Sequence, residues 1–486
     1  MKRKPVLYLG ATSLALVIAG GVGLVISEHT VSAQAPARGA TPPARGATPP
    51  ARGATAGGGA PSYRVNALWP QPLQNHWVLG AVSGVAVDKQ DHVWIVHRGA
   101  DSLESAEKAM ILTPPTSTVC CVPAPAVMEF DSAGRVVSSW GGPGLGFVWP
   151  QSTGGIAVDG EGNVWIAAFG LEPAPGGGRG RGAAPAADAA PAPARGAAPD
   201  GAAARGRGRG DAPAGDAAAQ PPARGRGAPP AAPAAAAADA HVTKYSRAGQ
   251  FILRIGTPGQ PGGPDSQTGL NRPAGVAVDD AASEVYIADS GNHRIAVFDS
   301  KTGAFKRSWG GSGDRPTAAG AGPYDPNAAP ARQFRDVTCV KIAKDGMVYV
   351  CDRSSDRIQV FQKNGTFVKE MVIAKETKGA VTTIGQAPGV VLNSAGSVWD
   401  VAFSSDAAQR YLFVADGHNN RIRILNRTSL AEVGQIGDGG RQPGRFLAPA
   451  AVAVDSRGNL YTGEVHHAKR VQKFTPAAAA APATGN

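Results

Sequence analysis

The chain has 486 residues, of which 43% are hydrophobic and only 6% aromatic, with 65 glycines and 40 prolines. Its formal net charge of +11 would suit a nucleic-acid partner only if Lys and Arg were clustered on the folded part. Much of the excess instead lies in the basic residues at 2–4 and 38–52, so the sequence does not favour nucleic acid as a partner.

The first 35 residues have the pattern of an export signal. Basic residues at 2–4 precede an apolar run over 5–26, and the small-x-small triplet Ala33-Gln34-Ala35 ends the segment. Two alternatives stay open for residues 1–35, a cleaved signal peptide and a retained N-terminal anchor, because the apolar run is long enough to span a bilayer. Either alternative predicts an extracytoplasmic protein, periplasmic or secreted, whose only membrane contact is an uncleaved N-terminal segment.

Two further segments have too little apolar content to offset the entropy of ordering them. Residues 36–60 repeat PARGATP, and residues 172–240 are almost wholly Ala, Pro, Gly and Arg with interspersed Asp. We predict a disordered linker at 36–60, a disordered insertion at 172–240 within a folded domain over 61–476, and a flexible tail at 477–486.

A short motif recurs through the folded domain. The sequence GVAVD at 84–88 returns, strictly or loosely, at 155–159, 275–279, 340–345, 401–406 and 451–455. Turn residues and a second β-rich segment, such as VWIV at 93–96, follow each copy. Periods of this length indicate a propeller or a solenoid, and six copies predict an all-β fold, a six-bladed β-propeller.

Third strands are predicted at 294–298, 357–361 and 421–425, and a fourth at 305–310, which gives four antiparallel strands per blade. The last repeat ends after its third strand, while an unassigned strand at 63–68 precedes the first blade. We predict that this N-terminal strand completes the last blade and closes the ring, because closure removes free sheet edges.

The four cysteines of an exported chain can be oxidised. Cys339 and Cys351 flank a predicted hairpin, so they face each other on adjacent strands and are a candidate disulfide. For Cys120 and Cys121, neighbours in a long loop, a vicinal bridge and two free or separately paired thiols stay open.

One face of the predicted ring is rich in polar side chains. Loops that join second and third strands lie on the same face as the segments entering the inner strands, and we call this the top face. Its predicted binding residues are His97, Asp101, Asn292, His293, Arg353, His418, Asn419, Glu464, His466 and His467. We predict that the top face binds a protein, a peptide or an envelope polymer. Its histidines are either solvated loop residues or ligands of a divalent metal.

Two acidic residues begin inner strands near the ring axis. Asp336 and Asp400 are candidates for binding calcium or for acting together as acid and base.

The segments at 285–298 and 412–425 resemble the NHL repeat, in which an Asp after the second strand is followed by Asn-x-Arg-Ile. The resemblance covers nearly all of 63–475 outside the insertion. In each repeat the Asp and the Arg are expected to hold the loop between them closed by a charge-assisted hydrogen bond. The three pairs are Asp289 with Arg294, Asp352 with Arg357, and Asp416 with Arg421.

The sequence VSGVAVD at 82–88, running on to His97-Arg98-Gly99, is similar to the peptidyl-α-hydroxyglycine α-amidating lyases. The resemblance implies a catalytic role for Arg98. The family's zinc-binding histidines are replaced here by Gly154, Thr338 and Ala450, and its tyrosine is absent. The sequence therefore predicts a binding or scaffold module, with a divergent metal-dependent lyase or hydrolase, using zinc or calcium at other ligands, as the alternative.

Overall fold

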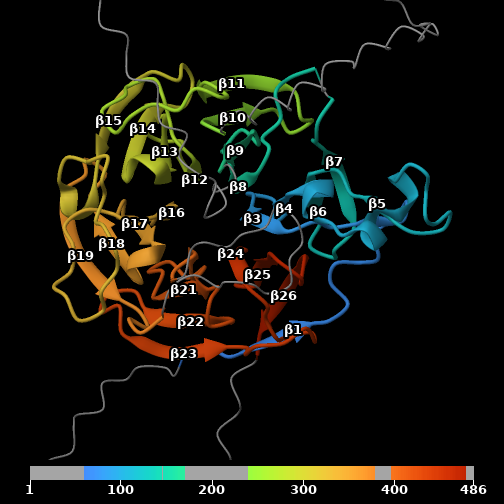
Figure 1. The fold of residues 1–486 in the computed structure, drawn as a ribbon. Helices are drawn as coiled ribbons and strands as arrows, with labels where there is room; N and C mark the ends of the chain where they lie inside the picture. Colours follow the sequence, from blue (N-terminus) through green and yellow to red (C-terminus); the bar gives the residue numbers. More distant parts are fainter. Residues whose placement is uncertain (1–59, 145, 170–238, 378–395, 478–486) are drawn as a thin grey trace, which may run out of the picture. The chain divides into compact units, whose positions relative to one another are not determined.

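Six four-stranded antiparallel sheets arranged in a ring make up the fold (Figure 1). The structure, a computed structural model, describes residues 60–144, 146–169, 239–377 and 396–477. The predicted six-bladed β-propeller is confirmed. The predictions for residues 1–35, for 36–59, for 172–238 and for 478–486 lie outside the described residues.

Blades 1 to 5 take their strands in chain order from the axis outward, and blade 6 takes its outermost strand from the N-terminal end of the domain. Blade 1 contains β3 (Val82–Val87), β4 (Val93–His97), β6 (Val127–Phe130) and β7 (Val136–Trp140), and blade 2 contains β8 (Thr153–Val158), β9 (Val164–Ala168), β10 (His241–Tyr245) and β11 (Phe251–Gly256). Blade 3 contains β12 (Pro273–Asp279), β13 (Glu284–Asp289), β14 (Arg294–Asp299) and β15 (Phe305–Trp309), and blade 4 contains β16 (Val337–Ile342), β17 (Val348–Asp352), β18 (Arg357–Phe361) and β19 (Phe367–Val372). Blade 5 contains β20 (Asp400–Phe403), β21 (Tyr411–Asp416), β22 (Arg421–Asn426) and β23 (Glu432–Ile436), and blade 6 contains β24 (Pro449–Val454), β25 (Leu460–Glu464), β26 (Arg470–Pro476) and β1 (Tyr63–Asn66).

The burial of the strands explains their composition. The second strands β4, β9 and β17 are buried along their whole length because a neighbouring blade covers each face, so both faces are apolar. The outer strand β11 is half-exposed instead, and Phe251 and Ile252 reach solvent. The core therefore consists of layers between adjacent blades, each filled by side chains such as Trp94 and Trp165.

The ring is closed by the N-terminal strand, as predicted. Strand β1 pairs antiparallel with β26, and Val65 lies opposite Phe474. Blade 6 therefore combines residues from both ends of the described chain, and its outer edge is formed by β1.

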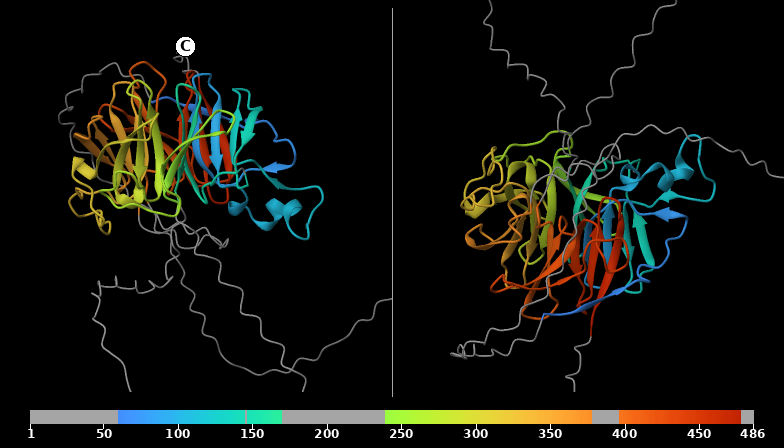
Figure 2. Two further views of the ribbon diagram at one scale, coloured as in Figure 1. Left: turned by 90° about the horizontal axis from the view of Figure 1, so that it is seen from above. Right: turned by 60° about the horizontal axis from the view of Figure 1, so that its bottom comes forward.

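A long loop separates the second and third strands of blade 1. It contains the 3-10 helices η1 (Gly99–Ser102) and η2 (Ser105–Ile111) and the short strand β5 (Val122–Pro123), which pairs in parallel with β2 (Trp77–Val78). Figure 2 shows this loop extending beyond the strands of blade 1. Within the loop, Cys120 and Cys121 are joined by a disulfide.

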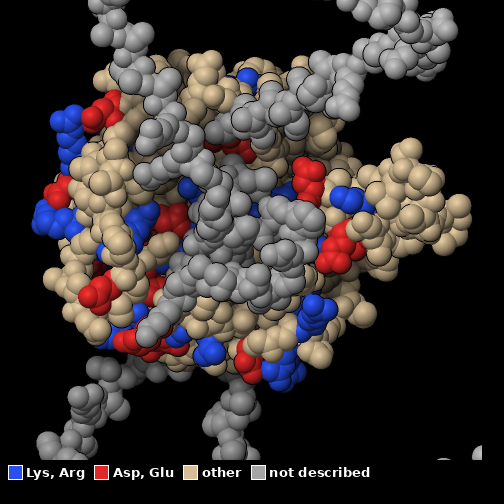
Figure 3. Space-filling view, in the orientation of Figure 1, with Lys and Arg blue, Asp and Glu red and all other residues tan. Residues whose placement is uncertain are grey.

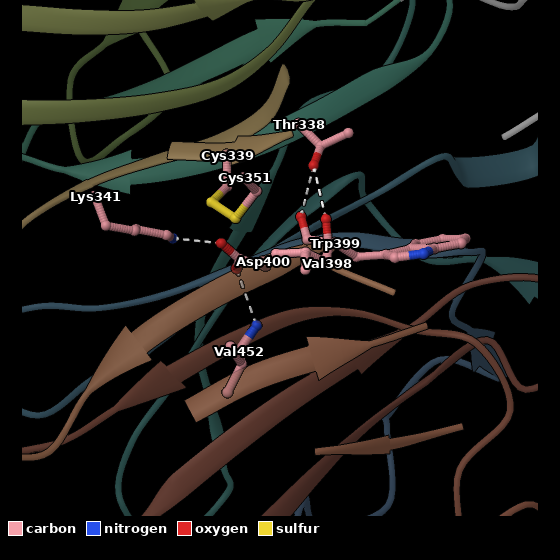
Figure 4. Close-up of a disulfide and its surroundings, with 8 residues drawn as sticks. All are labelled: Thr338, Cys339, Lys341, Cys351, Val398, Trp399, Asp400 and Val452. Carbon is pink, nitrogen blue, oxygen red and sulfur yellow. Dashed lines mark hydrogen bonds and ion pairs between the residues drawn. A yellow bond between two sulfur atoms is a disulfide. The ribbon is translucent and has the colours of Figure 1, made fainter. Parts of the chain in front are cut away.

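A second disulfide crosses the first two strands of blade 4. Cys339 on β16 lies opposite Cys351 on β17, with their Cα atoms 4.9 Å apart, and the two sulfurs are bonded (Figure 4).

Buried ion pairs close the loops after β13 and β17. Asp289 accepts a hydrogen bond from Arg294 Nε at 2.8 Å, and Asp352 accepts one from Arg357 Nε at 2.9 Å. All four side chains are almost completely buried. These two pairs hold their loops as the NHL resemblance implied.

The third predicted pair is wrong. Asp416 binds the Nε of Arg423 at 2.7 Å, while Arg421 donates to the carbonyl of Asn419 and to the side chain of Gln435. Strand β22 carries arginines at positions 421 and 423, which point to the same face of the strand, so the second arginine takes the place of the first.

Candidate functional site

Two arginines occupy equivalent positions in opposite blades. Arg98 directly follows β4 in blade 1, and Arg353 directly follows β17 in blade 4, which is three places round the six-membered ring. Burial lowers the pKa of Arg98 to about 10, and the positive charge of Arg353 adds to this effect. The two guanidinium groups therefore act on each other across the top end of the ring axis.

Arg98 has no carboxylate partner within the described parts of the chain. Its Nε donates a weak hydrogen bond to the carbonyl oxygen of Thr153 at 3.4 Å. A half-buried cation without a counterion is costly, and an added anion would relieve that cost.

Arg353 is held in place from two sides. Its Nε donates to Asp336 Oδ2 at 2.8 Å, and Ser290 Oγ donates to the other oxygen of that carboxylate at 2.7 Å. The guanidinium lies 5.0 Å from the ring centroid of Trp399 in a cation–π contact. Although burial raises the pKa of Asp336, the charge of Arg353 and the Ser290 hydrogen bond outweigh it and hold the pKa below its usual value.

His466 completes the cluster from blade 6. Its ring meets that of Trp399 edge-on, with centroids 6.4 Å apart. Burial lowers the pKa of His466 to about 3, and the charges of Arg98, His467 and Arg353 add to the shift. The imidazole is therefore neutral at pH 7, and its buried Nε2 has no hydrogen-bond partner among the described residues.

We call Arg98, Arg353, Trp399 and His466 the axial cluster. They come from blades 1, 4, 5 and 6, and their only carboxylate neighbour in the contacts above is Asp336, which leaves the cluster with net positive charge. Planar guanidinium groups bind carboxylates through paired hydrogen bonds, so the arrangement suits an anionic ligand.

The predicted pairing of Asp336 with Asp400 is wrong, because each carboxylate is bound to a different cation. Asp400 Oδ1 lies 3.2 Å from Lys341 Nζ, and Asp400 Oδ2 accepts a hydrogen bond from the amide of Val452 at 3.0 Å (Figure 4). Burial raises the pKa of Asp400, against the opposing charge of Lys341. Asp400 therefore links the inner strands of blades 4, 5 and 6, and Asp336 is the counterion of Arg353.

His97 was expected on the binding face, but it is buried. Its Nδ1 accepts hydrogen bonds from the amides of Gly80 and Gly99, so Nε2 carries the proton that is donated to the carbonyl of Pro125 at 2.9 Å. Burial lowers the pKa of His97 to about 4, which keeps the ring neutral. His97 thus fixes the loop that presents Arg98 and offers no free nitrogen to a ligand.

Asn292 and Glu464, also predicted binding residues, are buried as well. Asn292 donates to Asp289, and Glu464 accepts hydrogen bonds from Arg470, Gln472 and the amide of Leu447. Glu464 is buried because it supplies the acceptors for these three donors, whereas Asn292 is buried because it donates to the buried carboxylate of Asp289.

The remaining predicted residues lie in the top-face loops. His293 Nδ1 is hydrogen-bonded to the carbonyl of Arg335, and Asn419 donates to Asp416 and Thr377. His467 Nδ1 lies 3.7 Å from Glu104 Oε1. Asp101 is exposed and His418 is half-buried. Throughout the described ranges the top-face histidines belong to no group of three close metal-ligand side chains.

Lysines and arginines are interspersed with acidic side chains over the visible part of the face drawn in Figure 3. The local cluster at the axis, and not the overall charge, is therefore the distinctive electrostatic feature.

Asp356, in the loop after β17, has an unusual pKa. Its Oδ1 accepts a hydrogen bond from the amide of Ser397 at 2.7 Å, whereas its buried Oδ2 has no partner among the described residues. Burial raises the pKa of Asp356 to about 7, and the charge of Asp416 adds to the shift despite the opposing Ser397 hydrogen bond. In the unfolded chain the pKa returns to about 4.

The folded state therefore holds this proton more tightly than the unfolded state. The resulting stabilisation is full below about pH 4 and is lost as the pH rises through about 7. We expect Asp356→Asn, which cannot ionise, to raise the free energy of unfolding by about 2 kcal/mol at pH 8 and to change it little at pH 4. Urea unfolding at the two pH values measures this, and equal effects at both would contradict the assignment.

Comparison with known proteins places this fold among repeat propellers. The sequence model of the NHL repeat matches residues 270–298, which span β12, β13 and most of β14. The chain is thus a six-bladed β-propeller with an NHL repeat in blade 3.

Relatives named NHL repeat-containing protein 3 are 27% identical over 264 residues in Mus musculus and 26% identical over 258 residues in Homo sapiens. Each match covers 50% of this chain and 61% of the relative, so the chain spans less than two thirds of the relatives it matches.

Among solved structures, a catalytically inactive virginiamycin B lyase from Staphylococcus aureus with quinupristin is 12% identical with a TM-score of 0.38, covering 85% of this chain and 89% of that one. A protein of unknown function from Bacteroides thetaiotaomicron is 13% identical with a TM-score of 0.41, covering 82% and 70%. The architecture therefore rests on the strand pairing described above. In the described ranges, no helix is long and apolar enough to span a membrane.

Proposed function

We propose that this propeller is an extracytoplasmic binding module whose axial cluster receives the carboxylate of a peptide ligand. The observation that carries the proposal is the pair of opposed guanidinium groups, of which that of Arg98 lacks a carboxylate partner among the described residues.

The chemistry of the neighbouring groups supports a carboxylate. Arg98 offers its terminal nitrogens to a bidentate anion, and the neutral His466 offers a nitrogen that makes no other hydrogen bond in the described structure. Trp399 is buried and supports both groups, through its cation–π contact with Arg353 and its edge-on contact with His466.

Arg98→Ala is expected to weaken capture of peptides with a free C-terminal carboxylate by about 10-fold to 100-fold, the effect of losing one charge-assisted contact. The full chain is applied to an immobilised random peptide library in two forms, one ending in the free acid and one amidated. The acid form should bind better, and Arg98→Ala should remove that preference. Arg315→Ala is the matched control, because Arg315 is exposed and paired with Asp265.

Equal binding of the acid and amidated libraries would overturn the proposal. A second candidate, an Arg98-dependent lyase, is favoured by the neutral His466 beside Arg98, since an unprotonated imidazole can accept a proton. Release of glyoxylate from an α-hydroxyglycine-ended peptide with added zinc, abolished by Arg98→Ala, would establish this alternative and replace the binding proposal.

A further inference from the structure

A second charged cluster lies at the opposite ends of the strands, between blades 1 and 2. Asp88 and His92 belong to the turn that joins β3 to β4, and Glu129 projects from β6. His92 Nδ1 is 2.5 Å from Glu129 Oε1, and one ligand atom from each of the three side chains lies within 4.8 Å of the others. The group was not predicted, because Glu129 is 37 positions from His92 and reaches the turn that contains Asp88 and His92 only through strand pairing.

The equivalent position in blade 2 has a different chemistry. There Asp159 accepts a hydrogen bond from Asn163 Nδ2 at 3.1 Å and from Trp165 Nε1 at 3.2 Å. Lys244, at the strand position that corresponds to Glu129, neutralises Asp159 at 3.1 Å. Blade 2 therefore fills this position, which we call the corner, with the acid Asp159, the amide of Asn163 and the base Lys244.

Blade 6 repeats the arrangement of blade 2. Asp455 accepts a hydrogen bond from Asn459 Nδ2 at 2.7 Å and from the hydroxyl of Tyr461 at 3.0 Å. Lys473 lies over the Tyr461 ring at 5.4 Å, at the position that Lys244 has in blade 2. In two blades, therefore, the buried aspartate is accompanied by an asparagine and a lysine.

Blade 1 keeps the aspartate but replaces both of its companions. His92 stands where blades 2 and 6 have asparagine, and Glu129 stands where they have lysine. Two carboxylates that are almost completely buried therefore face each other, and Glu129 Oε2 is buried without a hydrogen-bond partner in the described structure. Such a corner requires a cation from elsewhere.

Arg247, from the turn between β10 and β11, occupies the corner with a single positive charge. It contacts Glu129, and its Nη1 lies 3.5 Å from Asp88 Oδ2, while its Nη2 lies 3.0 Å from His92 Nδ1. The Arg247 side chain is 41% exposed, whereas its backbone carbonyl is fixed by Trp140 Nε1 at 3.0 Å. The side chain can therefore leave the corner without moving the turn.

We propose that Asp88, His92 and Glu129 form a binding site for a divalent transition metal of the zinc or manganese type, which displaces the guanidinium of Arg247. One imidazole nitrogen and two carboxylates suit these ions and leave coordination positions for water. The proposal is independent of the axial cluster, which lies on the other face.

Isothermal titration of the full, untagged chain with Zn²⁺, and separately with Mn²⁺, tests the site. We expect one equivalent to bind at this corner. The double variant His92→Asn/Glu129→Lys installs the residues of blades 2 and 6, and should remove that equivalent, weakening its binding by at least about 100-fold, while the thermal midpoint shows that the chain still folds. His76→Asn, at an exposed histidine in the turn before β2, is the matched control and should leave the equivalent intact.

Arg247→Ala separates metal binding from a purely structural ion pair. If metal and guanidinium compete for the carboxylates, this variant binds Zn²⁺ about 10-fold more tightly than the unmodified chain. Unchanged or weaker binding would overturn the exchange with Arg247. Retention of the same equivalent in the double variant, or its absence from the unmodified chain with both ions, would overturn the site itself.

Discussion

Arg294→Ala is expected to lower the free energy of unfolding by about 3–5 kcal/mol, because it leaves a buried carboxylate without its cation. Arg294 is fully buried, and besides Asp289 its guanidinium donates to the carbonyls of Pro264, Ser266 and Gly269 at 2.7–2.9 Å. The side chain therefore ties the loop before β12 to the end of β13. Urea unfolding followed by tryptophan fluorescence measures the loss.

Blade 5 supplies the matched control for this prediction. Arg421 holds the equivalent position opposite Asp416, but its guanidinium bonds to Gln435 and to a backbone carbonyl while Arg423 binds the aspartate. Arg421→Ala should therefore cost about 1 kcal/mol or less. Equal losses at Arg294 and Arg421 would show that the ion pair is not what stabilises these loops.

Removing the disulfide of blade 4 should have the second largest effect. The double variant Cys339→Ala/Cys351→Ala opens a link between residues 12 positions apart, for which the chain-entropy model gives about 3 kcal/mol. The two cysteines are buried between blades 4 and 5, so the alanines also lose packing. We expect the variant to unfold at lower urea concentration, with a slope nearly unchanged if the native fold is retained.

Cys120→Ser/Cys121→Ser is the natural comparison, because that disulfide joins adjacent residues. The same model gives it about 1 kcal/mol or less. A reducing agent should therefore destabilise the unmodified chain almost as much as the blade 4 double variant does, and no shift on reduction would contradict a stabilising role for Cys339–Cys351.

The architecture could be predicted because each blade repeats a pattern that is local in sequence. The motif at 84–88 marks an inner strand and the following apolar run marks a second strand, so blade number and strand order follow from copies of one segment. The closing strand was found by elimination, since the last repeat lacked a fourth strand and 63–68 had no partner.

The candidate site could be predicted only in part. Sequence resemblance singled out Arg98, and the predicted top face included Arg353 and His466. That these side chains meet, together with Trp399, depends on ring geometry, because they come from four different blades. The burial of His97 could not be predicted either. A histidine at the end of a second strand suggests a binding residue, but His97 lies beneath a loop and fixes the backbone of that loop.

A direct comparison of blades would have found the second cluster. Aligning the third strands sets Glu129 against Lys244 and Lys473, and a reversal of charge at one repeat position is visible without coordinates. What the alignment lacks is Arg247, which reaches the corner from the neighbouring blade.

The closure of blade 6 joins two strands that are far apart in the sequence. Thr475 donates to the carbonyl of Arg64 across 411 positions of sequence, so the first and the last strands of the described residues pair with each other. Blades 1, 3, 4 and 5 each consist of segments that are near one another in sequence, whereas the pairing of β1 with β26 costs the loop-closure entropy of joining distant segments. A chain cut before β26 would leave β1 without the partner strand that it has in the folded ring, and its backbone groups would form a free sheet edge.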